Sequence, residues 1–141
     1  MRIMCLDVGE KRIGLAVSDP LGLTAQGLGV IQCQGKKKDL QQIRSFIDEY
    51  QAEELVLGLP LNMDGTQGEK AQEIIRLQAY LAARLPIPVF TCDERLTTVA
   101  AGKVLLEADI SRAGRKKVID KLAAVLILDS YLQHRKGMGN G

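Results

Sequence analysis

The hydrophobic pattern of this chain changes its period near residue 34, and that change restricts the folds that it can adopt. Before this point, residues 3–8, 13–18 and 28–33 each have the apolar character of a strand. The first of them is a continuous apolar run, which suits a strand buried on both faces of its sheet. Because its connection to the second strand is short, we expect these two strands to pair as an antiparallel hairpin.

After residue 34, helical and strand patterns alternate. Helices are predicted over residues 37–50, 71–85, 97–107 and 118–133, and strands over residues 55–59 and 88–92. A polar, basic loop is predicted at residues 111–117, before the last helix. A meander followed by βαβ units predicts an α/β fold with a mixed five-stranded sheet and helices on both of its faces.

The length of 141 residues is close to that of one domain, for which roughly 150 residues is the prior. We expect residues 1–135 to form a single domain and residues 136–141 to be a disordered tail. Aromatic residues make up only 4% of the chain, so the core should be aliphatic, and aromatic platforms for stacking nucleic-acid bases are not expected. A chain of this size has no room for two large lobes that close on a cofactor.

Cysteine and histidine are scarce, which narrows the chemistry. Cys5, Cys33 and Cys92 are an odd number without CxxC spacing, which predicts reduced thiols in a cytoplasmic protein. With His134 as the single histidine, a zinc site of cysteine and histidine is not expected. No apolar run approaches the roughly 18 residues that cross a bilayer, and no signal peptide is evident, so we expect no membrane partner. Acidic side chains are the best-supplied source of chemistry.

Acidic residues stand at three places in the predicted elements. Asp7 ends the first buried strand, where a carboxylate is costly unless something pairs with it, and α/β sheets place their sites at such strand ends. Asp93 and Glu94 follow the fifth strand, which reaches the same edge if it runs parallel to the first. Asp120 lies in the first turn of the last helix, on the same face as two alanines that would let the helix lie close to the sheet.

Each of these positions also has a purely structural explanation. Asp7 and Gly9 could simply shape the hairpin turn, Asp93 could cap the next helix, and Asp120 could be an ordinary surface charge. If the three elements meet at one edge, however, their carboxylates form the kind of site that Mg²⁺ or Mn²⁺ prefers. Such ions activate water for phosphodiester cleavage without histidine.

A cluster of basic residues leads into the last helix. It consists of Arg112, Arg115, Lys116, Lys117 and Lys121. Beside a metal site this cluster would hold a polyanion such as nucleic acid, whereas taken alone it could equally be a solvated run of charge. The sequence Lys36-Lys37-Lys38 is a weaker patch, which we interpret as the exposed start of a helix.

Four segments resemble the motifs of the YqgF (RuvX) family, in the same order along the chain. They are residues 6–18 (LDVGEKRIGLAVS), 56–66 (VLGLPLNMDGT), 93–98 (DERLTT) and 120–128 (DKLAAVLIL). The resemblance spans nearly the whole chain and implies a ribonuclease H-like fold, kin to that of the RuvC Holliday junction resolvases. It also implies a metal-dependent nuclease, described both as a junction resolvase and as a nuclease that processes the 5′ end of precursor 16S rRNA.

The acidic positions of the family correspond to Asp7, Glu94 and Asp120. The resemblance therefore implies that these residues are catalytic and hold Mg²⁺ or Mn²⁺. The RuvC enzymes place an acid at the end of the fourth strand, where this chain has Gly58-Leu59-Pro60, so their mechanism cannot be transferred whole. Glu94 would complete the acidic set, with Asp93 as the alternative, because strand alternation does not decide which of the two points inward.

The predicted partner is nucleic acid, either precursor rRNA, on a ribosomal particle, or branched DNA. Its predicted contacts are Gly9, Lys11, Arg12, Asn62, Arg95, Arg112, Arg115, Lys116 and Lys117. Symmetric cutting of a junction would favour a two-fold homodimer, whereas trimming of an RNA end would not. Two other functions stay open. One is a binding module without catalysis. The other is an actin-like nucleotide-binding protein, because the pattern Asp7-x-Gly9-x4-Gly14 resembles the phosphate-binding loop of that class. The short chain counts against the second.

Overall fold

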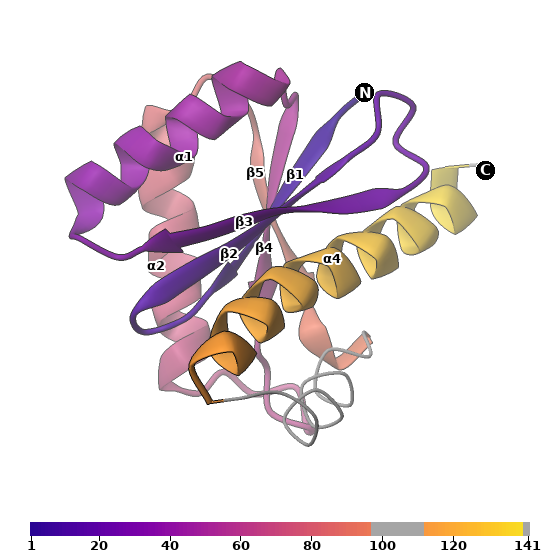
Figure 1. The fold of residues 1–141 in the computed structure, drawn as a ribbon. Coiled ribbons are helices and arrows are strands. Elements are labelled where there is room, and N and C mark those ends of the chain that lie inside the picture. The colour runs from indigo at the N-terminus through magenta and orange to yellow at the C-terminus, as the bar shows by residue number, and fades with distance from the viewer. Residues whose placement is uncertain (97–111, 140–141) are drawn as a thin grey trace.

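The computed structural model describes residues 1–96 and 112–139, with side chains described for residues 1–95 and 122–135. Its strands form one sheet in the order β3-β2-β1-β4-β5 (Figure 1). The strands are β1 (Ile3–Val8), β2 (Arg12–Ser18), β3 (Ala25–Gln32), β4 (Glu54–Leu59) and β5 (Val89–Asp93). The described helices are α1 (Lys36–Tyr50), α2 (Glu69–Arg84), the short 3₁₀ helix η1 (Glu94–Leu96) and α4 (Arg112–Gly139).

The sheet is mixed, as the sequence predicts. β1, β2 and β3 form an antiparallel meander, whereas β4 pairs parallel to β1 on its other side and β5 parallel to β4. The central place of β1 explains its continuous apolar sequence, because both of its faces are covered, and Ile3, Met4, Cys5 and Leu6 are all buried. Asp7 follows them near the carboxyl end of this strand.

Helices α1 and α2 cover one face of the sheet. Ile43 and Ile47 of α1 pack in one hydrophobic cluster with Ile74 and Leu81 of α2 and with Leu6 of β1. These residues follow the helical spacing that the sequence pattern predicts. Both predicted helices are confirmed, and their ends differ from the predicted ones by no more than two residues.

Helix α4 covers the opposite face, in front of the sheet in Figure 1. Ala123, Ala124, Ile127 and Leu128 are buried in a second cluster with Cys5 of β1. Because alanine side chains are short, the helix can lie close to the strands at this point, as the sequence predicts. Although α4 is 28 residues long, neither it nor any other helix in the described ranges is apolar enough to cross a membrane.

Three predicted boundaries are wrong. β3 begins at Ala25 rather than at residue 28, because pairing with β2 extends to Ser18 and overrides the weak strand preference of the glycines there. α4 begins at Arg112, so the predicted loop 111–117 is helical from residue 112; arginine and lysine have high helix propensity. The same helix continues through residues 136–139, predicted as disordered tail, because extending a helix needs no new nucleus. The helix predicted at residues 97–107 lies outside the described residues.

Candidate active site

The carboxyl ends of β1 and β4 meet the end of β5 at one edge of the sheet, and side-chain alternation determines which residues lie on the α4 face there. Residues two apart on a strand point to the same face. Cys5 packs in the cluster under α4, so Asp7 lies on that face as well. Glu94 follows the end of β5, and a Cβ atom at Gly58 would lie close both to its carboxylate and to Ile127 of α4. Both acids therefore lie on the side of the sheet that α4 covers.

A cavity of about 400 Å³ opens at this edge of the sheet. Its lining comes from the end of β1 and the turn after it, from the end of β4, and from the starts of α2 and η1: Asp7, Val8, Gly9, Glu10, Gly58, Pro60, Lys70 and Glu94. Asp7 is only 8% exposed. The structure thus brings Asp7 and Glu94 to one cavity, although sequence periodicity alone does not show that they meet.

Gly58, near the end of β4, leaves room for Glu94. A Cβ atom at position 58 would lie 3.0 Å from Oε1 of Glu94 and 2.7 Å from Cδ1 of Ile127 on α4. Both distances are well below the roughly 3.5–4.0 Å at which non-bonded carbon atoms attract, so the Glu94 carboxylate and Ile127 fill the space that a side chain at this position would need. The absence of a side chain at Gly58 therefore leaves the space that the Glu94 carboxylate occupies at the end of β4.

Gly9 shapes the β1–β2 turn at the rim of the cavity. Its N–H donates to the carbonyl oxygen of Arg12 at 2.8 Å, and a Cβ atom at Gly9 would lie 2.9 Å from the same oxygen. The structural explanation for this glycine therefore holds, and it also leaves backbone rather than a side chain at the rim. Lys11, in the same turn, is exposed, and Arg12 is partly buried.

The thiols of Cys5 and Cys92 have raised pKa values, partly because of the negative charge of the neighbouring acids. Burial raises the pKa of Cys5 well above its ordinary value, and the charges of Asp7 and Glu94 raise it further. Burial likewise raises the pKa of Cys92 to about 11, with contributions from Asp93 and Glu94. The Asp7 and Glu94 carboxylates thus both lie near the Cys5 thiol, and acids gathered in this way favour a bound cation.

Asp93 is engaged elsewhere. The Arg95 guanidinium donates two hydrogen bonds to Oδ2 of Asp93, from Nε at 3.0 Å and from Nη2 at 2.7 Å. These hydrogen bonds are the largest cause that holds the pKa of Asp93 below its usual range. Of the two adjacent acids between which the sequence does not decide, Glu94 lines the cavity and Asp93 forms an ion pair.

Arg95 also connects η1 to the loop that follows β4. Its Nη1 donates to the carbonyl oxygen of Met63 at 3.3 Å. Within that loop, Asn62 Nδ2 donates to Thr66 Oγ1 at 2.9 Å, and Thr66 Oγ1 donates to Asp64 Oδ1 at 2.6 Å. Arg95 and Asn62, both predicted to contact nucleic acid, therefore hold the loop in its place beside the cavity.

We expect Arg95→Gln to loosen this loop, because glutamine cannot replace a forked guanidinium that reaches Asp93 and Met63 together. The Gly65 amide, which donates to the carbonyl oxygen of Asn62 at 2.8 Å, should exchange its hydrogen several times faster. Hydrogen-exchange mass spectrometry on a peptide covering residues 60–68 measures this rate. Arg84→Gln, which removes an arginine stacked on Tyr80, is the matched control, and equal exchange in both variants would refute the anchoring role.

Lys70 is a basic residue of the cavity that the sequence pattern did not reveal. It lies in the first turn of α2, and its Nζ is 3.8 Å from Oε2 of Glu73. Its side chain is 38% exposed, so its ammonium group is open to an anion in the cavity. The available signal was topological: the loop that leaves the carboxyl end of β4 ends at Gly68, and a helix that starts there begins at the site edge of the sheet.

Asp120 lies in α4, one helical turn before Ala123 and Ala124, but its side chain is outside the described part of the chain. The same is true of the side chains of Arg112, Arg115, Lys116 and Lys117. Among the side chains that the structure does describe, no group of three His, Cys, Asp or Glu residues is placed to hold a metal ion. The described part of the site supplies two carboxylates, those of Asp7 and Glu94.

Comparison with known proteins identifies the family. The sequence model of the RuvX family, described as Holliday junction resolvase, matches residues 1–134. The chain belongs to the RuvX family. A relative from Syntrophomonas wolfei, named as a candidate pre-16S rRNA nuclease, is 56% identical over 132 residues, which cover 94% of each chain. A relative from Thermoanaerobacter pseudethanolicus with the same name is 53% identical over 137 residues, covering 96% of this chain and 99% of the relative.

Two solved structures of Holliday junction resolvases have a similar fold to this RuvX chain, at much lower sequence identity. RuvC of Thermus thermophilus, in complex with a Holliday junction substrate, is 16% identical, with a TM-score of 0.58 over 97% of this chain and 96% of that one. The Holliday junction resolvase of fowlpox virus is 17% identical, with a TM-score of 0.52 over 95% of this chain and 99% of that one. The ribonuclease H-like fold that the motifs imply is therefore confirmed.

Proposed function

We propose that this RuvX chain is a divalent-metal-dependent nuclease that hydrolyses phosphodiester bonds in structured nucleic acid. The observation that carries the proposal is the cavity at the strand ends, where the buried Asp7 and the partly buried Glu94 lie together with Lys70. Acids gathered beside a basic residue suit a phosphate substrate only if a cation lies between the acids and the phosphate. The family match supports the same conclusion.

The donor set of the cavity fits Mg²⁺ or Mn²⁺. Both ions prefer oxygen ligands, and the carboxylates of Asp7 and Glu94 offer such ligands. Asp7 is buried at the end of β1, and the Glu94 carboxylate lies beside Gly58. Asp120, on α4, would complete the set with a third carboxylate. A bound divalent ion supplies a Lewis acid, which makes a nucleophile of water at neutral pH and stabilises charge on the leaving oxygen.

The other tasks of the reaction fall to residues of this chain. Lys70 attracts the phosphate group into the cavity by charge, and the backbone at Gly9 lets the phosphate approach without a side chain in its way. Because Asp7 is 8% exposed and belongs to the central strand, its carboxylate is oriented before the substrate arrives, so little reorganisation is needed during the reaction.

Precursor 16S rRNA is the substrate that we propose first, because the relatives are named for it; resolution of a Holliday junction, the activity in the family description, is the second. Trimming of rRNA would place the protein in the cytoplasm, on a ribosomal particle, and its three unpaired thiols are consistent with this. Junction resolution would instead call for a homodimer. The remaining nucleic-acid contacts that we propose are Lys11, Arg12, Asn62, Arg112, Arg115, Lys116 and Lys117.

A cleavage assay tests the proposal. The purified protein is offered end-labelled precursor rRNA, a four-way DNA junction and plain duplexes, each with Mn²⁺ or with EDTA. We expect cutting of precursor rRNA with Mn²⁺ only. Glu94→Gln should slow it on the order of 10³-fold, because metal stabilisation of several kcal/mol is lost and each ~1.4 kcal/mol is tenfold. Asp93→Asn, one residue away, is the matched control and should keep most of the activity.

Each other outcome of this assay points to a different conclusion. Cutting that persists in EDTA, or equal losses in the Glu94 and Asp93 variants, would contradict the ligand role of Glu94. Binding without cutting of any substrate would favour the module that only binds nucleic acid. Paired, symmetric cuts in the junction by a protein that is dimeric in light scattering would favour resolution over rRNA processing.

A further inference from the structure

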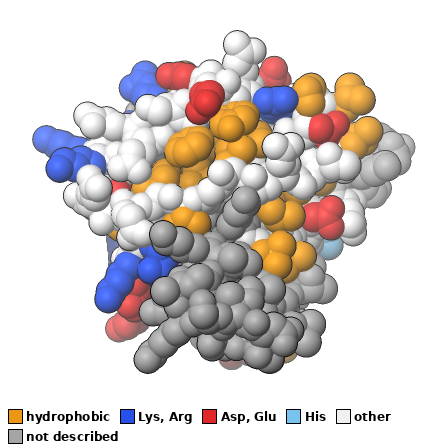
Figure 2. All heavy atoms as spheres, in the orientation of Figure 1, with side chains coloured by type: hydrophobic (Ala, Val, Ile, Leu, Met, Phe, Trp, Pro, Cys, Tyr) orange, Lys and Arg blue, Asp and Glu red, His pale blue; other side chains and the backbone are white. Residues whose placement is uncertain are grey.

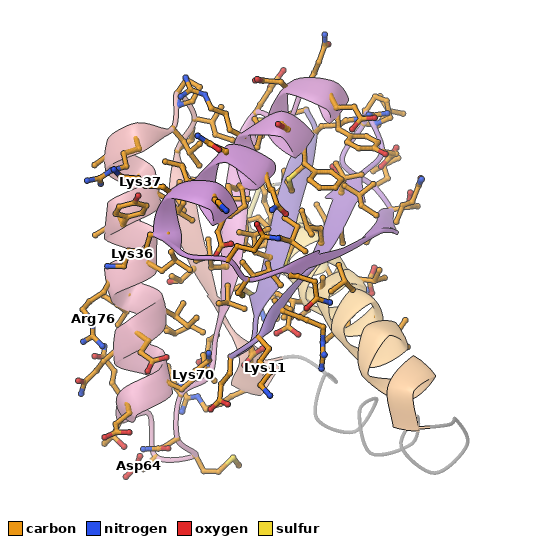
Figure 3. The ribbon with its side chains drawn as sticks, turned by 60° about the vertical axis from the view of Figure 1, so that its left-hand side comes forward. Lys11, Lys36, Lys37, Asp64, Lys70 and Arg76 are labelled. Carbon is orange, nitrogen blue, oxygen red and sulfur yellow. The ribbon has the colours of Figure 1, made fainter. Side chains whose placement is uncertain are left out.

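Basic side chains continue from the cavity along one side of the molecule, and those farthest from it have no part in the chemistry proposed above. Figure 3 shows these residues along one side of the molecule, from the turn between β1 and β2 and the start of α2 to the start of α1. They are Lys11, Lys36, Lys37, Lys70 and Arg76, which we call the basic strip. In Figure 2 the blue side chains along the left edge, over the start of α1 and over the β1–β2 turn, belong to the same region.

The strip is connected to the cavity at one end. Lys70 lines the cavity, and its charge also reaches the Cys33 thiol, whose pKa burial raises and Lys70 partly lowers again. The N–H of Cys33 donates to the carbonyl oxygen of Lys11 at 2.8 Å. The charge of Lys70 and the backbone of Lys11 thus both lie near Cys33, which is three residues before Lys36 at the start of α1.

Aromatic contacts fix the other end of the strip. The Nζ atom of Lys36 lies 5.5 Å from the centre of the Tyr80 ring, and the guanidinium of Arg84 lies 3.8 Å from the centre of the same ring. Such cation–π contacts hold both charges over α2. Lys37 and Arg76 are exposed beside them, so the positive charge continues from α1 onto the outer side of α2 (Figure 3).

Acidic residues of the same elements reduce this charge without cancelling it. Glu73 pairs with Lys70, and Asp39 accepts a hydrogen bond from the N–H of Gln34 at 2.8 Å. Glu10 and Glu69 are also present at the cavity end. The basic residues of the strip, with Lys38 and Arg84 next to it, still outnumber these acids, and they form a line rather than a compact cluster. A line of positive charge that begins at the cavity suits an extended polyanion.

We infer that the basic strip is the path along which the nucleic-acid backbone leaves the cavity, from Lys70 towards Lys36 and Lys37. The inference rests on the proposed nuclease function. At about 1.5 Å per residue of helix, the part of α2 from Lys70 to Tyr80 spans ~15 Å, which is the rise of about four nucleotides of a duplex strand at 3.4 Å each. Contacts between basic side chains and phosphates carry no sequence information, so the strip would set position and affinity without reading sequence.

Salt titration of binding tests the path. The full chain carrying Asp7→Asn, which prevents cutting, is titrated with a labelled precursor-rRNA fragment at several KCl concentrations. Lys36→Gln, Lys37→Gln and Arg76→Gln should each weaken binding several-fold and reduce the slope of log affinity against log salt by about 0.7–0.9, the value of one lost phosphate contact. Arg44→Gln, an exposed site two turns beyond Lys37 on α1, is the matched control and should leave the slope unchanged.

A shortened substrate locates the path further. Removing about four nucleotides from the side of the cleavage site that reaches the strip, the length estimated from the rise per nucleotide, should erase the difference between Lys37→Gln and the unsubstituted strip. Removal from the other side should not. Equal salt slopes in the strip variants and Arg44→Gln would overturn the path and leave the proposed cleavage intact. Reduced slopes in a protein whose wild type never cuts would overturn the cleavage and leave the path.

Discussion

Replacing Asp7 by asparagine should abolish metal-dependent cleavage while the fold is kept. Asparagine has nearly the same shape as aspartate, so the packing around this 8% exposed side chain is largely preserved, but the negative charge that attracts the metal is gone. We expect single-turnover cleavage to fall on the order of 10³-fold, because several kcal/mol of metal stabilisation are lost. Far-ultraviolet circular dichroism and the urea midpoint show whether the variant is folded.

Thermal unfolding gives a second measurement that does not depend on activity. A ligand that binds only the folded state stabilises it, so we expect Mn²⁺ at 100 times its Kd to stabilise the wild type by about 2.7 kcal/mol and to raise its Tm. The Tm of Asp7→Asn should respond far less, and Asp93→Asn should respond like the wild type. A Tm of Asp7→Asn that rises with Mn²⁺ as much as that of the wild type would rule out Asp7 as a ligand.

The change Gly58→Ala should impair both folding and cleavage. The new methyl group would lie 2.7 Å from Cδ1 of Ile127 and 3.0 Å from Oε1 of Glu94. Overpacking of this kind typically costs about 1–3 kcal/mol, measurable by urea unfolding. Cleavage should fall by roughly 10²-fold even where the variant is fully folded, because a displacement of about 1 Å in a catalytic group has that effect.

A second substitution separates the two consequences of Gly58→Ala. Ile127→Val removes the Cδ1 atom that the new methyl group would strike, and alone it should cost about 0.5–1.5 kcal/mol. In the double variant the two stability losses should be less than additive, whereas cleavage should stay low because the contact with Glu94 is unchanged. Recovery of cleavage along with stability would mean that the position of Glu94 does not depend on Gly58.

The sheet could be predicted well from the sequence because burial leaves a clear pattern. The apolar run of β1 indicates a central strand, and the change of hydrophobic period near residue 34 indicates the helices that cover the sheet. The start of α4 was not predictable in the same way. Its first residues are charged, and charge alone does not distinguish a loop from an exposed helix, since arginine and lysine favour helices as well.

The site could be predicted only in part. Asp7 was recognisable because a carboxylate at the end of a buried strand calls for a partner. The sequence did not show which of Asp93 and Glu94 faces the cavity. Such a choice depends on the alternation of side chains along a strand, and this alternation breaks where β5 ends at Asp93 and η1 begins at Glu94. Lys70 was missed because its place in the cavity depends on how the β4–α2 loop is folded, and spacing along the helix does not contain that information.

The strand order also determines when the cavity comes into being during synthesis. Asp7 leaves the ribosome early, with the hairpin of β1 and β2, but its partner Glu94 follows β5, which pairs with β4 at the far edge of the sheet. Parallel pairings between distant segments are among the slow steps of folding, and translation adds roughly 5–20 residues per second. A growing chain therefore carries one half of its cavity for several seconds before the other half exists, and the proposed site is complete only after β5 has joined the sheet.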